Sequence, residues 1–252
     1  VDDRPPPVLS RRAGIGALLE PAHEVLELGR SCRGIHDDAE AVLLREVRDT
    51  VARDAVDWSR VEFFWGDERF VAPDDPERNE LQAREALLDH VPVNPALVHP
   101  MGADTGTGPS GANTAAQEYA ELLHQLAHPE DHGPVPTFDI LLLGMGPEGH
   151  TASVFPHSPA VYETERTVVA VHNSPKPPPT RISLTLPAIR HAAEVWILAT
   201  GEAKAAAVAL ALGGAGEVAI PVAGARGRRR TLWLLDRAAA ERLPRHLLPP
   251  LT

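Results

Sequence analysis

Beyond about residue 38, short apolar runs alternate along the chain with segments whose apolar residues recur at helical spacing. Short apolar runs between polar or glycine-rich segments are typical of buried strands, whereas an apolar residue every three or four positions is typical of a helix. The pattern predicts strands at Val61–Trp65, Phe138–Leu143, Thr167–Val171, Ile182–Leu186, Val195–Thr200 and Thr231–Leu235. It predicts a helix that begins near Asp37 and further helices at Asn79–His90, Ala112–Ala127 and Glu202–Leu212. Such alternation indicates the α/β class, with a mostly parallel sheet covered by helices on both faces.

The first 37 residues do not follow this pattern. They contain one stretch that fits a short helix, Ala22–Leu28, but no run that fits a buried strand. Arginine, proline and glycine are frequent among them, and this composition indicates irregular structure. We therefore expect an irregular N-terminal segment, residues 1–37, followed by a single α/β domain, residues 38–252.

The charge of the chain limits its partners. A net charge of -11 disfavours binding to nucleic acid or to an anionic membrane surface, because both depend on clustered cations. An anionic ligand would need a few placed cations, and only two of the 24 basic residues are lysines, Lys176 and Lys204. The single cysteine, Cys32, excludes an intrachain disulfide and fits a reducing cytoplasm. No segment has the pattern of a membrane span or of a signal peptide.

A glycine-rich segment follows one of the predicted strands. Gly144, Gly146 and Gly149 match the G-x-G-x-x-G expression of dinucleotide sites. Such a site also needs a long helix after the third glycine, but Pro156 stops any helix early here. We therefore expect a turn whose free N–H groups, together with a short helix that starts near His150, face a polar or anionic ligand atom.

His150 has two interpretations. In the first it is a structural or capping histidine of a tight turn. In the second it is a general base, because it lies beside Glu148 at the carboxyl end of a predicted strand, where ligands of parallel sheets bind. The exposed backbone donors of the turn would then supply an oxyanion site.

Charged residues follow a second predicted strand. Its apolar run stops at Gly66, which is followed by Asp67, Glu68 and Arg69. They form either a solvated charged loop or a carboxylate beside a guanidinium that binds an anion. Arg181 and Lys204 lie where two further loops meet predicted elements. Together with Arg69, these cations would allow an acidic protein to hold a phosphate.

Two other kinds of site have little support. His124, His128 and His132 are spaced by four residues, but Pro129 breaks the helix that would align them as metal ligands. The sequence has no G-x-S-x-G nucleophile elbow, so a serine hydrolase mechanism is not indicated.

Several segments, in a fixed order, together resemble the 6-phosphogluconolactonase family. They cover about three quarters of the chain and read WGDERFV, ERNELQAREALLDHV, HPM, FDILLLGMGPEGHTASVFPHSPAV, SPKPPPTRISLTLPAI, WILATGEAKAAAV and TLWLLD. The resemblance implies a three-layer Rossmann-like sandwich with a mostly parallel sheet, shared with glucosamine-6-phosphate deaminase and ribose-5-phosphate isomerase. It also implies hydrolysis of 6-phospho-D-glucono-1,5-lactone to 6-phosphogluconate in the oxidative pentose phosphate pathway, without metal or cofactor. We expect this enzyme to be a cytoplasmic monomer.

The resemblance implies roles for particular residues. His150 would activate the water that attacks the lactone carbonyl and then assist departure of the ring oxygen. Asp67 would orient the base or the substrate hydroxyls, and Glu148 joins them as the third expected catalytic residue. The expected substrate-binding residues are Arg69, Arg181 and Lys204 at the phosphate, Asn79 and Lys176 as further contacts, and Gly144, Gly146 and Gly149 through backbone N–H groups at the oxyanion.

The deaminases of the same family are the nearest alternative enzymes. They are similar to this chain at five residues, Asp67, Glu148, His150, Arg181 and Lys204. A glutamate, however, follows their histidine by five residues and completes a proton relay. This chain has Phe155 at that position. An apolar ring does not move protons, which favours the lactonase.

One segment departs from the resemblance. The family carries a glycine-rich phosphate loop ahead of the GDER segment, and this chain has LGRSCRGIHDDAEAV in its place. Two functions therefore stay open: an active lactonase, and a catalytically impaired sugar-phosphate-binding relative that lacks this loop.

Overall fold

The structure is a computed structural model that describes residues 39–50, 52–244 and 247. The expected irregular segment, residues 1–37, lies outside the described residues, as does the predicted helix start at Asp37. The helices are α1 (Ala39–Asp49), α2 (Ala52–Ala55), α3 (Asn79–Ala86), α4 (Pro109–Leu126), α5 (Leu186–Ile189) and α6 (Ala205–Leu212). The strands are β1 (Phe63–Phe64), β2 (Asp67–Arg69), β3 (Val98–His99), β4 (Ile140–Gly144), β5 (Val168–Val171), β6 (Arg181–Leu184), β7 (Glu194–Ala199) and β8 (Arg230–Leu235).

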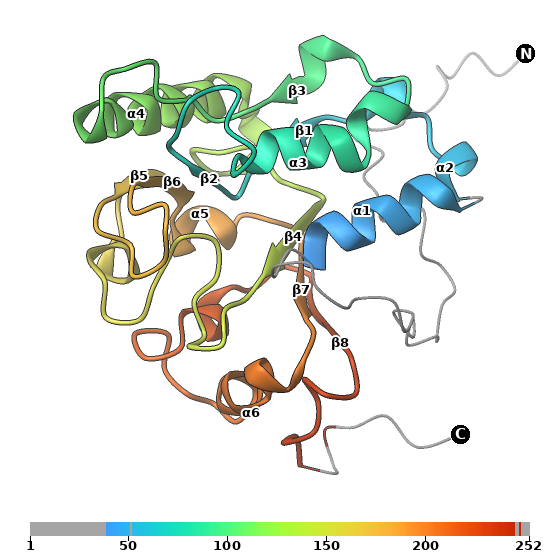
Figure 1. Ribbon diagram of the computed structural model, residues 1–252, viewed down its shortest axis with the longest axis vertical. Helices are drawn as coiled ribbons and strands as arrows, with labels where there is room; N and C mark the ends of the chain where they lie inside the picture. The colour runs from blue at the N-terminus through green and yellow to red at the C-terminus, as the bar shows by residue number, and fades with distance from the viewer. Residues whose placement is uncertain (1–38, 51, 245–246, 248–252) are drawn as a thin grey trace, which may run out of the picture.

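A parallel sheet with the order β4-β7-β8 forms one half of the fold (Figure 1). Every residue of the central strand, β7, is buried, which explains the unbroken apolar run that predicted it. α1 packs against β4 and β7. A second, short parallel pair joins β1 to β3. The predicted α/β class with parallel sheets is confirmed.

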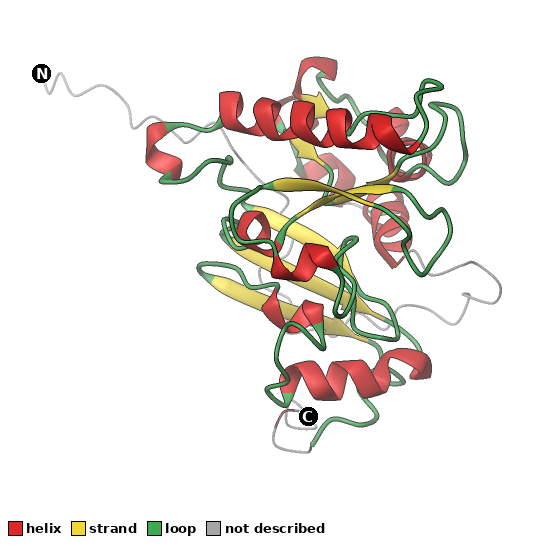
Figure 2. Cartoon of the chain, turned by 90° about the vertical axis from the view of Figure 1, so that its left-hand side faces the viewer, coloured by secondary structure: helices red, strands yellow, loops and turns green. Residues whose placement is uncertain are grey.

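A separate antiparallel sheet, with the order β2-β6-β5, forms the other half. The sequence interpretation assigned β5 and β6 to a mostly parallel sheet, and this was wrong. Residues 172–180 are all that join the two strands, whereas a parallel connection needs a crossover of roughly a dozen residues or more. α4 packs across β5 and β6, and Figure 2 shows the strands of both sheets lying between α4 and α6.

Four predicted elements have other boundaries in the structure. The strand predicted at Val61–Trp65 is reduced to β1, and α3 ends at Ala86, after which Leu88–His90 form a 3-10 turn. The strand predicted to reach Leu186 stops at Leu184, because Thr185 caps α5 by accepting a hydrogen bond from the N–H group of Ala188. The helix predicted over Glu202–Leu212 begins as a 3-10 turn before α6.

The main core includes buried side chains of both the parallel and the antiparallel sheet and of the helices packed on them, and a second, smaller cluster surrounds Trp58. The largest fully buried apolar side chains include Trp58, Leu123, Ile182, Trp196 and Ile197. Burial of side chains of this size supplies the main stabilisation of such a fold. None of the helices in the described part of the chain is long and apolar enough to cross a membrane.

Candidate active site

The turn after β4 folds His150 back against the end of the strand. The N–H group of Gly146 donates to the carbonyl of His150 at 3.0 Å, and the N–H group of Gly149 donates to the carbonyl of Gly146 at 2.9 Å. The hydroxyl of Thr151 donates to the carbonyl of Gly144 at 2.9 Å. Two expectations are therefore wrong: turns rather than a helix follow His150, and the N–H groups of Gly146 and Gly149 are used inside the turn instead of facing a ligand.

Two glycines of this turn are required by close packing. A Cβ atom on Gly146 would overlap the imidazole of His150 and would lie 2.7 Å from Oε2 of Glu148. Gly149 has a φ of +88°, and a side chain there would meet Cγ2 of Ile220 at 2.9 Å. The glycines thus allow the histidine and the glutamate to lie directly over the backbone of the turn.

His150 and Glu148 form a hydrogen-bonded pair. Nδ1 of His150 lies 2.8 Å from Oε1 of Glu148, and Nζ of Lys176 lies 3.4 Å from Oε2 of the same carboxylate. Burial alone would raise the pKa of Glu148, but the hydrogen bond from His150, the backbone N–H group of Glu148 and the charges of His150 and Lys176 together lower it to about 2. Glu148 is therefore a carboxylate at neutral pH and accepts a hydrogen bond from the N–H group at Nδ1 of His150.

Phe155 and Arg181 connect this pair to the antiparallel sheet. The ring of Phe155 stacks on His150 with its centroid 4.5 Å away, and the guanidinium carbon of Arg181 lies 5.9 Å from the same ring centroid. Arg181 is buried, and its Nε and Nη2 donate to the carbonyls of Pro178, Pro177 and Lys176. Arg181 thus fixes the proline-rich loop that carries Lys176 toward Glu148.

Asp67 lies on a strand, β2, where the sequence interpretation placed it in a loop. Its Oδ2 accepts a hydrogen bond from the hydroxyl of Ser153 at 2.7 Å. The side-chain amide of Asn79 donates to the backbone carbonyl of Asp67 at 2.8 Å and lies 3.4 Å from its Oδ1. The predicted site residues Asp67 and Asn79 are therefore in direct contact.

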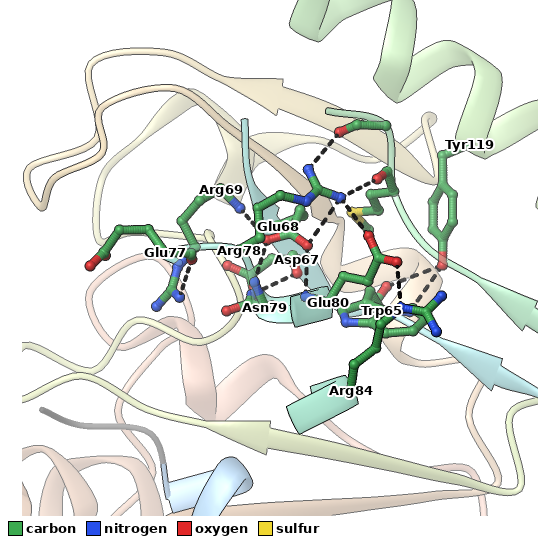
Figure 3. Close-up of polar contacts among 12 residues, drawn as sticks. Trp65, Asp67, Glu68, Arg69, Glu77, Arg78, Asn79, Glu80, Arg84 and Tyr119 are labelled. Carbon is green, nitrogen blue, oxygen red and sulfur yellow. Dashed lines mark hydrogen bonds and ion pairs between the residues drawn. The ribbon is translucent and has the colours of Figure 1, made fainter. Parts of the chain in front are cut away.

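Glu68 is the residue that the sequence interpretation left without a role. It is fully buried, which contradicts a solvated charged loop. Figure 3 shows its carboxylate against the start of α3, where it accepts the N–H groups of Asn79 at 2.7 Å and Glu80 at 3.0 Å, and it pairs with the buried Arg78 at 3.5 Å. Burial raises the pKa of Glu68, while Arg78 and the backbone donors act in the opposite direction. Only the middle one of the three residues, Glu68, is buried in β2, and because Asp67, Glu68 and Arg69 are all charged, this alternation leaves no apolar–polar pattern in the sequence.

Two further predicted residues, Arg69 and Lys204, lie on β2 and just beyond the carboxyl end of β7. Arg69 is paired with Arg181 in the register of β2 and β6, and its Nη1 donates to the carbonyl of Glu77 at 2.8 Å. Lys204 is buried just beyond the carboxyl end of β7, the strand that pairs with β4 through Gly144. Lys204 and Gly144 thus share the sheet edge with His150.

This arrangement combines a fixed imidazole with cations. Glu148 holds Nδ1 of His150, which leaves Nε2 as the basic atom, and Phe155 covers one face of the ring. Such an imidazole is suited to activate a water molecule. No three His, Cys, Asp or Glu side chains among the described residues are grouped so that they could hold a metal ion. The helix α4 ends at Leu126, before His128 and His132.

Comparison with known proteins places the chain in a family. Residues 39–233 match the family described as glucosamine-6-phosphate isomerases/6-phosphogluconolactonase. A relative named 6-phosphogluconolactonase, from Streptomyces coelicolor, is 61% identical over 208 residues, which are 82% of this chain and 80% of the relative.

Solved structures agree with this match. The 6-phosphogluconolactonase of Trypanosoma brucei superposes with a TM-score of 0.70 at 31% identity, over 84% of this chain and 85% of that one. A monomeric glucosamine-6-phosphate deaminase has a TM-score of 0.64 at 19% identity, over 80% of this chain and 83% of that one, and it shares the fold. The chain belongs to the family of glucosamine-6-phosphate isomerases and 6-phosphogluconolactonases.

Proposed function

We propose that this protein hydrolyses 6-phospho-D-glucono-1,5-lactone to 6-phosphogluconate. Relatives that are 55% to 61% identical to the chain are named 6-phosphogluconolactonases, which supports an active lactonase over the catalytically impaired relative. The observation that carries the proposal is the pair of His150 and Glu148, whose nitrogen and oxygen lie 2.8 Å apart beside the apolar ring of Phe155.

The reaction begins at Nε2 of His150, because Nδ1 keeps its proton and donates a hydrogen bond to the carboxylate of Glu148. Nε2 takes a proton from water as the water oxygen bonds to the lactone carbonyl carbon, and the carbonyl oxygen becomes an oxyanion. The oxyanion then re-forms the carbonyl, the bond to the ring oxygen breaks, and the imidazolium returns its proton to that oxygen. The carboxylate of Glu148 stabilises the imidazolium between these steps. No step is routed through a metal or a cofactor.

Cations hold the phosphate in this proposal. Arg69 and Lys204 supply positive charge to the phosphate, while Arg181 keeps the loop of Lys176 in place. Because the N–H groups of Gly146 and Gly149 are used within the turn, we assign Lys176, 3.4 Å from Glu148, to the side of the developing oxyanion. Asp67 and Asn79 orient the substrate hydroxyls or the base. The three-layer arrangement, the cytoplasmic location and the monomeric state stay predictions.

The direct test uses purified protein and lactone generated in the assay from glucose 6-phosphate. We expect lactone to disappear well above its spontaneous rate, with 6-phosphogluconate as product. Glucosamine 6-phosphate is offered in a parallel assay that measures ammonia, and we expect none because Phe155 replaces the relay glutamate. Lactone loss at the spontaneous rate overturns the proposal, and ammonia release makes the protein a deaminase.

A further inference from the structure

Ser153 contacts a predicted catalytic residue far away in the sequence. Its hydroxyl donates to Oδ2 of Asp67 at 2.7 Å, across a separation of 86 residues. Ser153 is fully buried. A hydrogen bond to an ionised carboxylate is stronger than one between neutral groups, and water does not compete with it at a buried hydroxyl.

The position of Ser153 is itself fixed. Its backbone N–H group donates to the hydroxyl oxygen of Ser183 at 3.0 Å, and that hydroxyl donates to the carbonyl of Leu184 at 2.8 Å. Ser183 is fully buried and lies directly opposite Asp67 in the register of β2 and β6. Each member of this buried network therefore has a defined partner, and such networks hold one geometry.

Ser153 also belongs to the turn that carries His150. The two residues are three positions apart, and Thr151 between them is anchored to the carbonyl of Gly144 at 2.9 Å. The N–H group of Val154 donates back to Thr151 at 2.9 Å. The hydrogen bond from Ser153 thus ties the carboxylate of Asp67, on the antiparallel sheet, to the histidine turn at the end of the parallel sheet. Asn79, at 3.4 Å from the other oxygen, is a weaker restraint.

We propose that Ser153 is a positioning residue that holds the Asp67 carboxylate in register with His150 for lactone hydrolysis. This inference rests on the proposed function. It predicts that loss of the hydroxyl disturbs the geometry of the reacting groups and leaves the phosphate contacts in place, so the effect falls on kcat rather than on KM.

The test compares Ser153→Ala with the wild-type enzyme and with Ser158→Ala. Ser158 is a suitable control, because its hydroxyl lies in the same segment and donates to the carbonyl of Phe155 at 2.8 Å. We expect Ser153→Ala to lower kcat about 10- to 100-fold, as for the loss of one hydrogen bond to a charged group. KM should stay close to the wild-type value, and the melting temperature should fall by no more than about 10 °C, the size expected for one buried hydrogen bond. Ser158→Ala should keep kcat within about twofold. Ser153→Cys keeps the size of the side chain with a much weaker donor and should lose kcat as well.

Several results would overturn the positioning role of Ser153. A wild-type kcat in Ser153→Ala, a loss that appears in KM alone, or an equal loss in Ser158→Ala overturns the positioning role. A fall in activity that accompanies a large fall in melting temperature in both the Ala and the Cys variants also overturns it, because the role would then be structural. A wild-type protein without lactonase activity instead contradicts the proposed function, and the inference falls with it.

Discussion

The imidazole of His150 stacks on the ring of Phe155, with the two planes 30° apart and the ring centroids separated by 4.5 Å. Phe155 is 2% exposed, so the histidine rests on a buried apolar surface. Stacking on Phe155 fixes the plane of the imidazole, and the hydrogen bond to Glu148 fixes the direction in which Nδ1 points within that plane. Phe155, the ring that favours a lactonase over a deaminase, thus also supports the imidazole that we propose as the base.

Replacement of this ring should affect stability and catalysis together. We expect Phe155→Ala to lower the free energy of unfolding by about 3 to 5 kcal/mol, since it leaves a cavity at a buried site. It should also lower kcat, because His150 loses its support. Phe155→Leu keeps more of the volume and should cost less in urea denaturation. A Phe155→Ala variant as stable as wild type would show that the ring is not part of the packed core.

A methyl group at Gly146 should displace His150 and Glu148, the proposed catalytic pair. Because the added Cβ atom would overlap His150 and come within 2.7 Å of Glu148, we expect Gly146→Ala to lower kcat at least about 100-fold. Gly216→Ala is the matched control, as nothing lies within 4 Å of the Cβ position there. Lactone assays of both variants measure the difference. Equal activity of the two variants would mean that the turn relaxes without moving the imidazole.

The buried pair of Glu68 and Arg78 should be important for folding. Glu68→Gln removes the fully buried carboxylate that faces Arg78 and leaves Arg78 with the less buried Glu80, 3.1 Å away, as its anionic partner. Breaking a buried ion pair costs up to about 3 to 5 kcal/mol. Arg166→Ala, which breaks an exposed pair with Glu163, should cost less than about 1 kcal/mol. Chemical denaturation of both variants gives the comparison. If the Glu68→Gln cost is no larger than that of Arg166→Ala, the anchoring of α3 by this carboxylate is wrong.

Glu148 should make the protein sensitive to acid. Its pKa falls from 4.5 to about 2 on folding, so its contribution to stability is fully present above pH 4.5 and is lost as the pH falls toward 2. Glu148→Gln should therefore flatten the decline of melting temperature in this range. Glu118→Gln, at an exposed position on α4, should leave the decline as it is in wild type. Identical pH profiles for wild type and Glu148→Gln would contradict the lowered pKa.

Part of the fold follows from the sequence, and the rest depends on contacts that a sequence pattern does not contain. The apolar run of β7 predicts a buried strand because both of its faces are covered. β2 was missed because its three residues, Asp67, Glu68 and Arg69, are all charged, and such a run suggests a solvated loop. Glu68 can be buried in a strand only because a buried cation faces its carboxylate. That cation, Arg78, comes from the start of α3.

The candidate site was also predicted only in part from the sequence. The glycine-rich turn directed attention to His150, but the reason for its glycines, room for the imidazole and the carboxylate, appears only in three dimensions. Ser153 has no charge and no motif of its own to distinguish it. Its partner, Asp67, is 86 residues away, and only the folded chain brings the two together.

The central claim is that His150 is the base of a lactonase, and its most direct test is the rate of lactone opening by wild type and His150→Ala measured above the spontaneous rate. General acid–base catalysis contributes about 100- to 10,000-fold, so we expect a loss of that size with a melting temperature close to wild type. A His150→Ala variant that keeps the wild-type rate would contradict the claim.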